Sequence, residues 1–497
     1  MIEVLSVENM RESDKATIMA GTPSRELMWR AALGIYEAMG EVLEKTKKTL
    51  IIAGTGNNAG DGYALALILK ENGYPVSILQ LKDKYSSDGK YYFDKCVEKG
   101  IKIEQYDKNT LPSVDILVDC ILGTGFLGEV NDEVRELIEK INASGAYVVS
   151  ADINSGLNGD SGMGTCSVKS DLTVSIGSYK SGHFLNMAKD KIGKLVNCDI
   201  GISPVYQPYY LFQKEDAKKL LGTRPQFSHK GTYGYVTLIG GSYEYSGAVK
   251  LANLAASSMR AGAGVVKLAC PKSIAHAVMP YLLESTLFPL SEENGHIKLD
   301  ENEIKGAIKG VKAIGVGMGL GTGEDNEKLI RYLMSEARVS LLLDADALNT
   351  LAKMGEIPKM KALLILTPHP KELERLSGKS VEKIQNNPVD SAKEYAKKAG
   401  AILLLKGAST VVTDGEKVVI IDTGCAGMAT AGSGDVLSGI ITATLAQPNI
   451  STFDAVCLGA YINGLSGEIA EGEHTAISML ASDTALSVDK AIKHILK

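Results

Sequence analysis

The sequence predicts two consecutive α/β domains, in each of which parallel strands alternate with helices. The length of 497 residues corresponds to two to four domains at roughly 100–200 residues each. Short apolar runs alternate with amphipathic segments in both halves, which is typical of doubly wound parallel sheets. This alternation stops around residues 204–221, where prolines, aromatic residues and charges follow one another. We therefore expect one domain over residues 1–210 and a second over 211–497.

In the first half, five short apolar runs have the length and composition of buried strands. These predicted strands are residues 49–53, 76–81, 115–121, 146–151 and 172–176. Helical spacing of apolar residues predicts helices at 24–43, 63–72 and 131–142. We interpret this half as a Rossmann-like doubly wound domain.

The second half repeats the same pattern without a repeat that can be aligned. Its predicted strands are residues 235–239, 265–269, 313–316, 341–343, 363–366 and 402–405. Helices are expected at 248–261 and 436–445. A second layered α/β domain follows from this alternation.

Composition excludes several classes of protein. With 45% hydrophobic and 23% charged residues the chain is not disordered, and a net charge of −6 argues against nucleic acid or an anionic membrane as partner. No uncharged apolar run reaches the roughly 18 residues of a membrane span, and the N-terminus is charged too early for a signal peptide. The seven cysteines form no CxxC pair, so we expect no disulfide framework, and a cytoplasmic location.

Glycine-rich, oxygen-rich loops follow three predicted strands of the first half. They are GTGNNAGDG at 54–62, DCILGTGFLGE at 119–129 and DINSG at 152–156. Ligands bind at the carboxyl ends of parallel strands, and oxygen ligands suit hard cations. Each feature has a purely structural alternative: the first loop as a generic turn, Asp119 as a helix cap and Ser155 as a turn residue.

The three ordered motifs resemble those of the epimerase family that repairs hydrated NAD(P)H. The resemblance implies a potassium ion held by Asn58, Asp119 and Ser155, and Asp152 as the catalytic group at the reacting ring, where a carboxylate can exchange a proton. Two departures are Ala59, where the family has glycine, and Asn154, where it has proline and which we expect to loosen the turn. The implied dinucleotide contacts are Asp152, Asn57, Asn58, Ala59, Gly60, Asp61, Gly123, Thr124, Gly125, Phe126, Leu127, Gly128 and Glu129.

The strongest local pattern of the second half is the run of small residues TGCAGMATAGSGD before a predicted helix. Backbone N–H groups at such a helix N-terminus bind an anion and stabilise charge on transferring phosphate oxygens. Asp435 lies inside this mouth, where it repels phosphate but can take a proton from an attacking hydroxyl. The alternative is an N-capping aspartate.

This Gly-x-Gly-Asp mouth resembles the ribokinase-like superfamily, and four further segments resemble its hydrated-NAD(P)H dehydratase branch. Those segments are GMGLG, DADAL, TPHPKEL and KGAST, in the family's order. The resemblance implies that Gly319, His369 and Asp435 contact the hydrated nicotinamide. His369 has a structural alternative, and Asp344 and Asp346 either support magnesium or cap a helix. The implied ADP or ATP contacts are Lys406, Gly407, Ala408, Ser409, Thr410, Cys425, Ala426, Gly427, Met428, Ala429, Thr430, Ala431, Gly432, Ser433 and Gly434.

Together the two resemblances imply a bifunctional enzyme that repairs hydrated NADH and NADPH. One domain interconverts the R and S forms and the other dehydrates the S form with ADP and magnesium, giving AMP and phosphate. A vitamin kinase of the hydroxymethylpyrimidine or thiazole type is the alternative for the second domain. A non-catalytic binding or oligomerisation module is the alternative for the first. We also expect a homo-oligomer.

Overall fold

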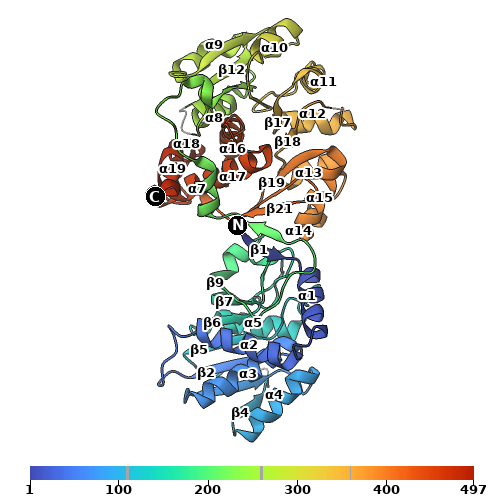
Figure 1. Cartoon of the computed structure of the whole chain (residues 1–497), viewed down its shortest axis with the longest axis vertical. Helices are drawn as coiled ribbons and strands as arrows, with labels where there is room; N and C mark the ends of the chain where they lie inside the picture. The colour runs from blue at the N-terminus through green and yellow to red at the C-terminus, as the bar shows by residue number, and fades with distance from the viewer. Residues whose placement is uncertain (108–110, 258–260, 359) are drawn as a thin grey trace. The chain divides into compact units, whose positions relative to one another are not determined.

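The computed structural model describes residues 1–107, 111–257, 261–358 and 360–497. The chain divides into two compact units (Figure 1). The N-terminal unit comprises residues 3–209, and the C-terminal unit comprises residues 210–497 with residues 1–2. Each unit has its own parallel sheet and its own hydrophobic core. The predicted α/β class is therefore confirmed for both.

The N-terminal unit contains a parallel seven-stranded sheet in the order β4-β3-β2-β5-β6-β7-β9. A further short parallel pair joins β1 (Ile2–Leu5) to β8 (Tyr179–Lys180). All five predicted strands are confirmed. The two outer strands, β4 and β9, were not predicted, because exposed or half-buried edge strands lack the continuous apolar run of a central strand. The strands of the sheet are β2 (Thr49–Ala53), β3 (Val76–Gln80), β4 (Lys102–Gln105), β5 (Ile116–Cys120), β6 (Tyr147–Ala151), β7 (Ser170–Ile176) and β9 (Ile192–Cys198).

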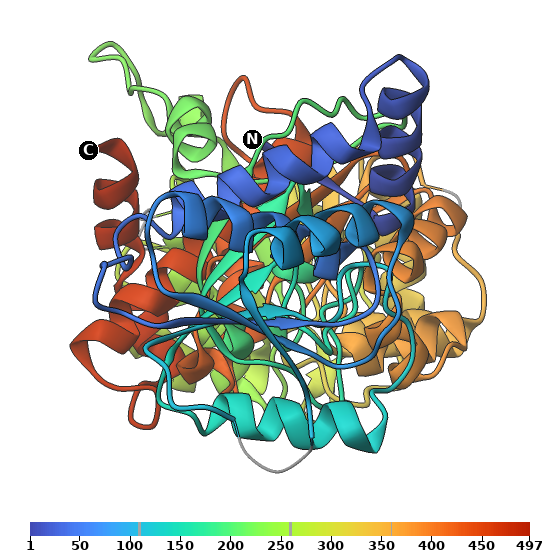
Figure 2. The same cartoon turned by 90° about the horizontal axis from the view of Figure 1, so that it is seen from below.

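Helices cover both faces of this sheet, as Figure 2 shows. Ile51 and Val118 face the core under α2, α3 and α4, whereas Leu50 and Leu117 face the core under α5. Alternate residues of a strand point to opposite faces, so both layers are filled from the same strands. The helices are α1 (Val7–Met19), α2 (Ser24–Ala38), α3 (Asn57–Glu71), α4 (Ser87–Glu98), α5 (Asp132–Asn142) and α6 (Ala188–Lys191).

Helix α3 begins six residues before the predicted start at Tyr63. The glycine-rich loop itself forms the first turns, with Gly56 at the N-cap. Every residue from Asn58 to Leu69 is buried, so the segment lacks the polar face on which helical periodicity depends. As a result, Asn57, Asn58 and Asp61 are carried on a rigid helix end rather than on a free loop.

The C-terminal unit contains a sheet in the order β13-β12-β11-β16-β17-β18-β19-β20-β21-β10. The strands from β13 to β19 are parallel, whereas β20 is antiparallel to both of its neighbours. All six predicted strands are confirmed. The strands are β10 (Tyr209–Leu211), β11 (Tyr235–Ile239), β12 (Val265–Pro271), β13 (Thr286–Leu290), β16 (Ala313–Val316), β17 (Ser340–Leu343), β18 (Leu364–Leu366), β19 (Ala401–Leu405), β20 (Thr410–Thr413) and β21 (Val418–Ile421), with a separate hairpin of β14 (Glu292–Glu293) and β15 (His296–Ile297).

Small residues let α16 lie directly against α8 in the core of this unit. A Cβ on Gly439 would lie 2.2 Å from the Ala252 carbonyl oxygen, so only glycine fits. The helix predicted at 248–261 is confirmed as α8 to residue 257, and residues 258–260 lie outside the described part of the chain. The helices are α7 (Lys214–Leu221), α8 (Ser246–Ser257), α9 (Lys272–Val278), α10 (Glu301–Ala307), α11 (Asn326–Glu336), α12 (Asp346–Met354), α13 (Pro370–Ser377), α14 (Val381–Asn386), α15 (Pro388–Ala399), α16 (Ser433–Thr444), α17 (Thr452–Glu473), α18 (Ala481–Leu486) and α19 (Val488–Leu496).

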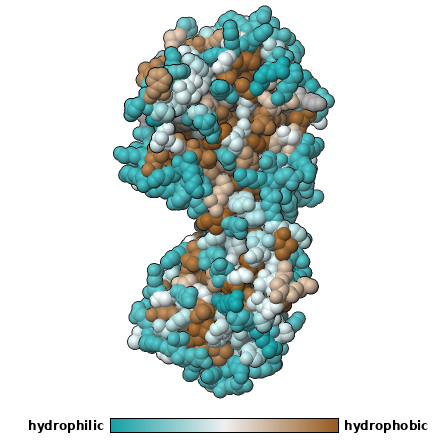
Figure 3. All heavy atoms as spheres, viewed as in Figure 1, coloured by the Kyte–Doolittle hydropathy of each residue, from teal (hydrophilic) through white to brown (hydrophobic). Residues whose placement is uncertain are grey.

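The surface carries no large continuous apolar band on the face seen in Figure 3, where hydrophobic side chains are interspersed among hydrophilic ones. Among the described residues, no helix combines the length and the apolar character that a membrane crossing requires.

The close approach of β2 and β5 generates a stability prediction. A Cβ on Gly54 would lie 2.0 Å from the Ile121 carbonyl oxygen, whereas a Cβ on Gly56 meets nothing within 4 Å. We expect Gly54→Ala to lower the free energy of unfolding of the N-terminal unit by about 2–4 kcal/mol, because backbone must move. The matched control Gly56→Ala costs less than about 1 kcal/mol. Urea unfolding followed by the fluorescence of Trp29, the single tryptophan, measures both; equal costs would contradict the clash.

Candidate functional site

A cavity of about 550 Å³ lies in the N-terminal unit at the carboxyl ends of β2, β5 and β6. These three strands are neighbours and parallel, so the loops that follow them meet at one edge of the sheet. Residues 55–58, 121–126 and Asp152 line the cavity, together with parts of α1 and α2 and with Lys180. The three motifs that the sequence analysis singled out are thus brought together.

Asp152 is held from several sides at the floor of this cavity. Its Oδ1 accepts a hydrogen bond from Lys180 Nζ at 2.5 Å, and its Oδ2 accepts from the N–H (3.2 Å) and the hydroxyl (2.9 Å) of Thr124. Its φ of 65° is a strained conformation for a residue other than glycine. Burial raises the pKa of Asp152, but the Lys180 ammonium and these hydrogen bonds outweigh it and leave the pKa below its ordinary value.

Lys180 and His183 are site residues that sequence reasoning missed. Lys180 is 1% exposed and also donates to the Ile176 carbonyl oxygen at 2.7 Å. His183 Nδ1 accepts the Lys180 N–H, so its Nε2 carries the proton and donates to the Asp152 carbonyl oxygen at 2.8 Å. Burial and Lys180 lower the pKa of His183 to about 4, so the ring is neutral. No motif marks these two residues; Lys180 follows β7 and Asp152 follows β6, and the parallel pairing of these neighbouring strands brings the two segments together.

Asp119, Ser155 and Asn58 form a second, deeper cluster. Asp119 is fully buried and accepts the Ser155 hydroxyl at 2.5 Å, the Ser155 N–H at 2.9 Å and the Ser150 hydroxyl at 3.0 Å. Burial raises the pKa of Asp119, and these hydrogen bonds oppose the rise. Asn58 Nδ2 donates to the Leu122 carbonyl oxygen at 3.0 Å, and Ser155 Oγ accepts the Leu122 N–H. The buried Asn58 Oδ1 has no hydrogen-bond partner.

The structure separates the predicted dinucleotide contacts into two groups. Gly123, Thr124, Gly125 and Phe126 line the cavity, whereas Leu127, Gly128 and Glu129 are exposed and do not line it. Ala59 and Gly60 are buried within the first turns of α3.

Neither departure from the family's motifs disturbs the site. Ala59 lies in helix α3 without positive φ, so a side chain is accommodated there. The expectation that Asn154 loosens its turn is wrong. The Asn154 amide is fully buried, donates to Val168 O, Ser170 Oγ and Lys191 O and accepts the Thr173 hydroxyl, all within 3.0 Å. Four hydrogen bonds thus fix the segment in place of a proline ring.

In the C-terminal unit, Lys406 is the centre of a charged cluster. Its Nζ lies 2.9 Å from Asp344 Oδ1 and 3.5 Å from Glu372 Oε2, and the Ser438 hydroxyl donates to Asp344 Oδ2 at 2.7 Å. Asp344 follows β17 and Lys406 follows β19, which lie on either side of β18. A Cβ on Gly434 would lie 3.6 Å from both Asp344 Oδ2 and Lys406 Nζ, so the start of α16 lies beside this cluster.

Asp435 occupies the first turn of α16 but does not cap it. The N-cap is Gly432, with φ 93°, and no side chain makes the capping hydrogen bond. The N-capping alternative is therefore excluded by the structure. Burial, reinforced by Asp344 and opposed by Lys406, raises the pKa of Asp435 to about 7. A carboxyl group of this pKa can accept a proton near neutral pH.

The sequence left two roles open for each of three residues: ligand contact or structural role for His369, and magnesium support or helix capping for Asp344 and Asp346. His369 is the N-cap of α13: its Nδ1 accepts the Lys371 N–H at 3.1 Å, and its N–H donates to Glu372 at 2.8 Å. Its side chain remains 47% exposed, with Nε2 3.6 Å from Glu372 Oε2, so the capping role does not bury the ring. Neither aspartate caps α12, whose N-cap Ala345 has no side-chain capping bond; Asp346 instead accepts the Gly321 N–H.

Acidic side chains of α17 accept hydrogen bonds from the backbone of the small-residue segment before α16. Glu468 accepts the Gly424 N–H and Glu471 accepts the Gly427 N–H. Ala426, Ala429 and Ala431 remain exposed, as do Gly407 and Ala408. Gly319 adopts φ 68° with the Tyr245 carbonyl oxygen 2.5 Å from where a Cβ would stand. The geometry leaves an accessible, backbone-rich surface around Lys406 and Asp435.

Comparison with known proteins identifies the family. A family model described as NAD(P)H-hydrate dehydratase matches residues 236–489, and one described as YjeF-related protein N-terminus matches residues 24–182. The bifunctional NAD(P)H-hydrate repair enzyme of Coxiella burnetii is 32% identical, covering 95% of this chain and 96% of its own. Its Escherichia coli namesake is 31% identical, covering 97% of this chain and 92% of its own. This chain belongs to the bifunctional NAD(P)H-hydrate repair enzyme family.

Solved structures agree with this family for the C-terminal unit. The ADP/ATP-dependent NAD(P)H-hydrate dehydratase of Bacillus subtilis, co-crystallised with ATP and Mg²⁺, is 29% identical with a TM-score of 0.50, covering 58% of this chain and 99% of its own. A ribokinase-like superfamily protein of Enterococcus faecalis, 22% identical over 59% of this chain and 98% of its own, has a TM-score of 0.51. The predicted ribokinase-like fold is thereby confirmed.

The buried Lys180–Asp152 ion pair should contribute measurably to the stability of the N-terminal unit. Removing one member of a buried ion pair leaves the other charge unpaired, which costs about 3–5 kcal/mol. We therefore expect Lys180→Met to lower the free energy of unfolding of the N-terminal unit by that amount, and Asp152→Asn in addition to recover part of it. Urea unfolding followed by Trp29 fluorescence is the measurement.

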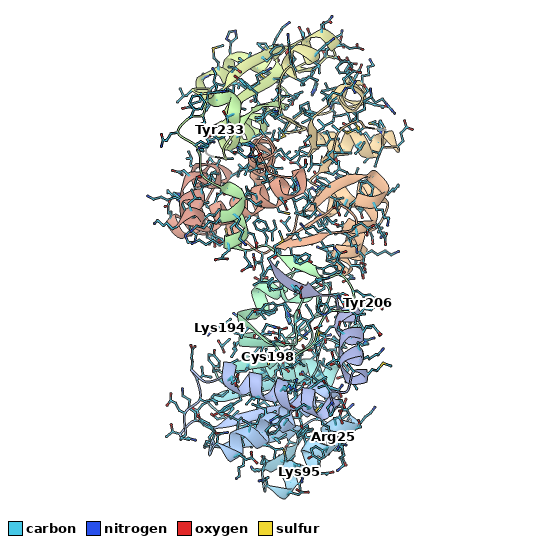
Figure 4. The ribbon with its side chains drawn as sticks, viewed as in Figure 1. Arg25, Lys95, Lys194, Cys198, Tyr206 and Tyr233 are labelled. Atoms are coloured by element: carbon cyan, nitrogen blue, oxygen red, sulfur yellow. The ribbon has the colours of Figure 1, made fainter. Side chains whose placement is uncertain are left out.

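Lys194 provides the control, because its ion pair with Glu41 at 3.2 Å is exposed (Figure 4). Exposed pairs contribute little, so Lys194→Met should leave the unfolding curve unchanged within error. Equal losses in the two variants would show that burial of the Lys180 pair does not matter.

Proposed function

We propose that the C-terminal unit dehydrates the S form of hydrated NAD(P)H at the expense of ADP or ATP. The observation that carries the proposal is Asp435, a carboxyl group with a pKa of about 7, placed in the mouth of α16 beside Lys406. The family membership of the chain supplies the substrate class.

The chemistry proceeds through phosphorylation of the C6 hydroxyl. Asp435 takes the hydroxyl proton, and the oxygen attacks the terminal phosphorus of the nucleotide, whose bridging P–O bond breaks. The C6–O bond then breaks with its electron pair leaving on phosphate, while the N1 lone pair forms C6=N1. Loss of a C5 proton restores the dihydropyridine ring. Hydroxide is a poor leaving group and phosphate a good one, which is why the nucleotide is consumed.

Backbone N–H groups at the start of α16 and Lys406 would stabilise the transferring phosphoryl group. The proposed nucleotide contacts are those of residues 406–410 and 425–434, and Gly319 and His369 would contact the hydrated nicotinamide. Ser433 Oγ is buried without a hydrogen-bond partner, which suits a ligand contact. Magnesium would enter bound to the nucleotide phosphates, as Mg²⁺ commonly does.

For the N-terminal unit we propose interconversion of the R and S forms at C6 in the 550 Å³ cavity. Residues 57–61 and 123–129 would contact the dinucleotide, with Asp152 at the reacting ring. A dehydratase specific for one epimer strands the other, so an epimerase on the same chain makes both forms repairable.

A potassium ion fits the cluster of Asn58, Asp119 and Ser155. Asp119 is a fully buried carboxylate that accepts hydrogen bonds from neutral hydroxyl and backbone N–H groups, and Asn58 Oδ1 is a buried oxygen that lacks a donor. A buried anion and a free amide oxygen are the ligand types that a hard cation takes. When bound, the ion would neutralise Asp119 and fix the substrate loops at residues 122–124.

The vitamin-kinase alternative is disfavoured, because curated relatives with both activities in their name match nearly the whole chain. A non-catalytic role for the N-terminal unit is an outcome of the tests below. A cytoplasmic location and a homo-oligomeric state stay predictions.

Replacing the carboxyl group of residue 435 tests the dehydratase. Asp435→Asn should reduce formation of NADH absorbance from the S form with ADP or ATP by about 10²–10⁴-fold, because the general base is lost. In the unaltered enzyme the rate should rise with pH through about 7, as Asp435 ionises.

The same full-length variant separates the two activities. It should still interconvert the epimers, observed by NMR of the C6 proton starting from the R form. Dehydration at the normal rate would refute the role of Asp435, and absence of interconversion would support the non-catalytic module.

Replacing potassium tests the cation site. Epimerisation by the dialysed enzyme should increase on adding KCl and much less with LiCl of equal ionic strength, since the smaller ion does not span the cluster. The increase should disappear in Asp119→Asn, whereas dehydratase turnover in that variant should be unchanged. Equal rates in both salts would show that no potassium site operates.

A further inference from the structure

Two carboxylates in the N-terminal cavity have no assigned role in proton transfer. Asp14 lies on α1 and Asp61 on α3, and both line the cavity. Asp61 is only 9% exposed, yet no hydrogen bond or ion pair to either carboxylate is found among the described residues. Asp14 also lies ahead of the matched segment 24–182. Unpaired carboxylates at a substrate cavity suit proton transfer, because their oxygens remain available to a ligand.

Asp152 is a weaker candidate for moving protons. Both of its oxygens are occupied, one by Lys180 and the other by Thr124, and its pKa lies below the ordinary value. A carboxylate that is both low in pKa and fully hydrogen-bonded holds its charge and accepts a proton poorly. Its fixed position instead suits orienting the substrate.

We propose that Asp14 and Asp61 form the acid–base pair of the epimerase, with Asp152 and Lys180 as positioning residues. The inference rests on the function proposed for this unit. In ring opening, ionised Asp14 takes the proton of the C6 hydroxyl and C6=O forms. The C6–N1 bond breaks with its electron pair going to N1, which receives the proton of Asp61. Rotation about C5–C6 turns the other face of the aldehyde to N1, and the reverse transfers close the ring and restore both residues.

The charges around the cavity favour a state in which Asp14 and Asp61 together carry one proton. Burial raises the pKa of both groups, that of Asp61 well above its ordinary range. Asp152 raises both pKa values further, Asp14 raises that of Asp61, and Lys180 opposes these shifts. Asp61 therefore retains its proton when Asp14 has lost its own. The other titratable groups at the cavity are Arg11, Asp88 and, behind Asp152, the neutral His183.

Asp14→Asn and Asp61→Asn in the full-length enzyme test the pair. The rate at which the R form is converted, followed by NMR of the C6 proton and corrected for the rate without enzyme, should fall at least 10²-fold in each variant. The KM for the R form should change less than threefold, and turnover of the S form with ADP or ATP should be unaltered. Glu12→Gln, which removes a carboxylate on α1 that pairs with Lys15, is the matched control and should retain full activity.

The pH profile distinguishes catalysis from a structural role. The unaltered enzyme should show a bell-shaped profile for epimerisation, and Asp14→Asn should lose the limb that falls toward acid pH. The inference is overturned if Asp14→Asn keeps its rate within threefold, or loses rate without a change in the profile. Failure of the unaltered enzyme to epimerise would instead refute the proposed function. Should Asp61→Asn not fold, as judged by Trp29 fluorescence, Asp14→Asn alone decides.

Discussion

A buried lysine–aspartate ion pair organises each of the two candidate sites. Lys180 meets Asp152 in the N-terminal unit at 2.5 Å, and Lys406 meets Asp344 in the C-terminal unit at 2.9 Å. Each pair fixes a full negative charge where little water can screen it. Burial raises the pKa of a neighbouring carboxyl group, Asp61 in one unit and Asp435 in the other, and the aspartate of the pair raises it further while the lysine opposes the rise. Burial and the neighbouring aspartate together bring the pKa of Asp435 to about 7, so this group titrates near neutral pH.

Parallel sheets make both arrangements possible, because they bring the ends of neighbouring strands to one edge. The residues involved come from distant parts of the chain: Asp344 and Lys406 are 62 positions apart. Glycines then let helices approach that edge. Gly54 fits under the Ile121 carbonyl oxygen before α3, and Gly434 lies beside Lys406 and Asp344 at the start of α16. A side chain at position 54 would collide with the Ile121 carbonyl oxygen and push apart the two segments that lead into the site.

Local signals in the sequence predicted most of the fold and much of the two sites. Buried central strands have continuous apolar runs, and the oxygen-rich loops directly follow them, so both could be predicted. Lys180 and His183 could not, because no local motif marks them and they reach Asp152, 28 and 31 positions earlier, only through the pairing of β7 with β6 and their own hydrogen bonds. The prediction that Asn154 loosens its turn was wrong for a related reason. Its four hydrogen-bond partners come from segments that a local motif does not contain.

The two proposed reactions ask different things of their carboxylates, and the surroundings differ accordingly. Phosphoryl transfer needs a single base that releases its proton only after the leaving group departs, and Asp435 stands alone at a helix mouth whose N–H groups bind phosphate. Epimerisation begins and ends with the same protonation state, so a base and an acid must both be present and both be restored. Two unpaired carboxylates that share one proton meet this requirement in either direction. Ring opening leaves the base protonated and the acid ionised, and ring closure reverses both transfers. Asp152, whose two oxygens already accept hydrogen bonds from Lys180 and Thr124, instead holds its charge in place.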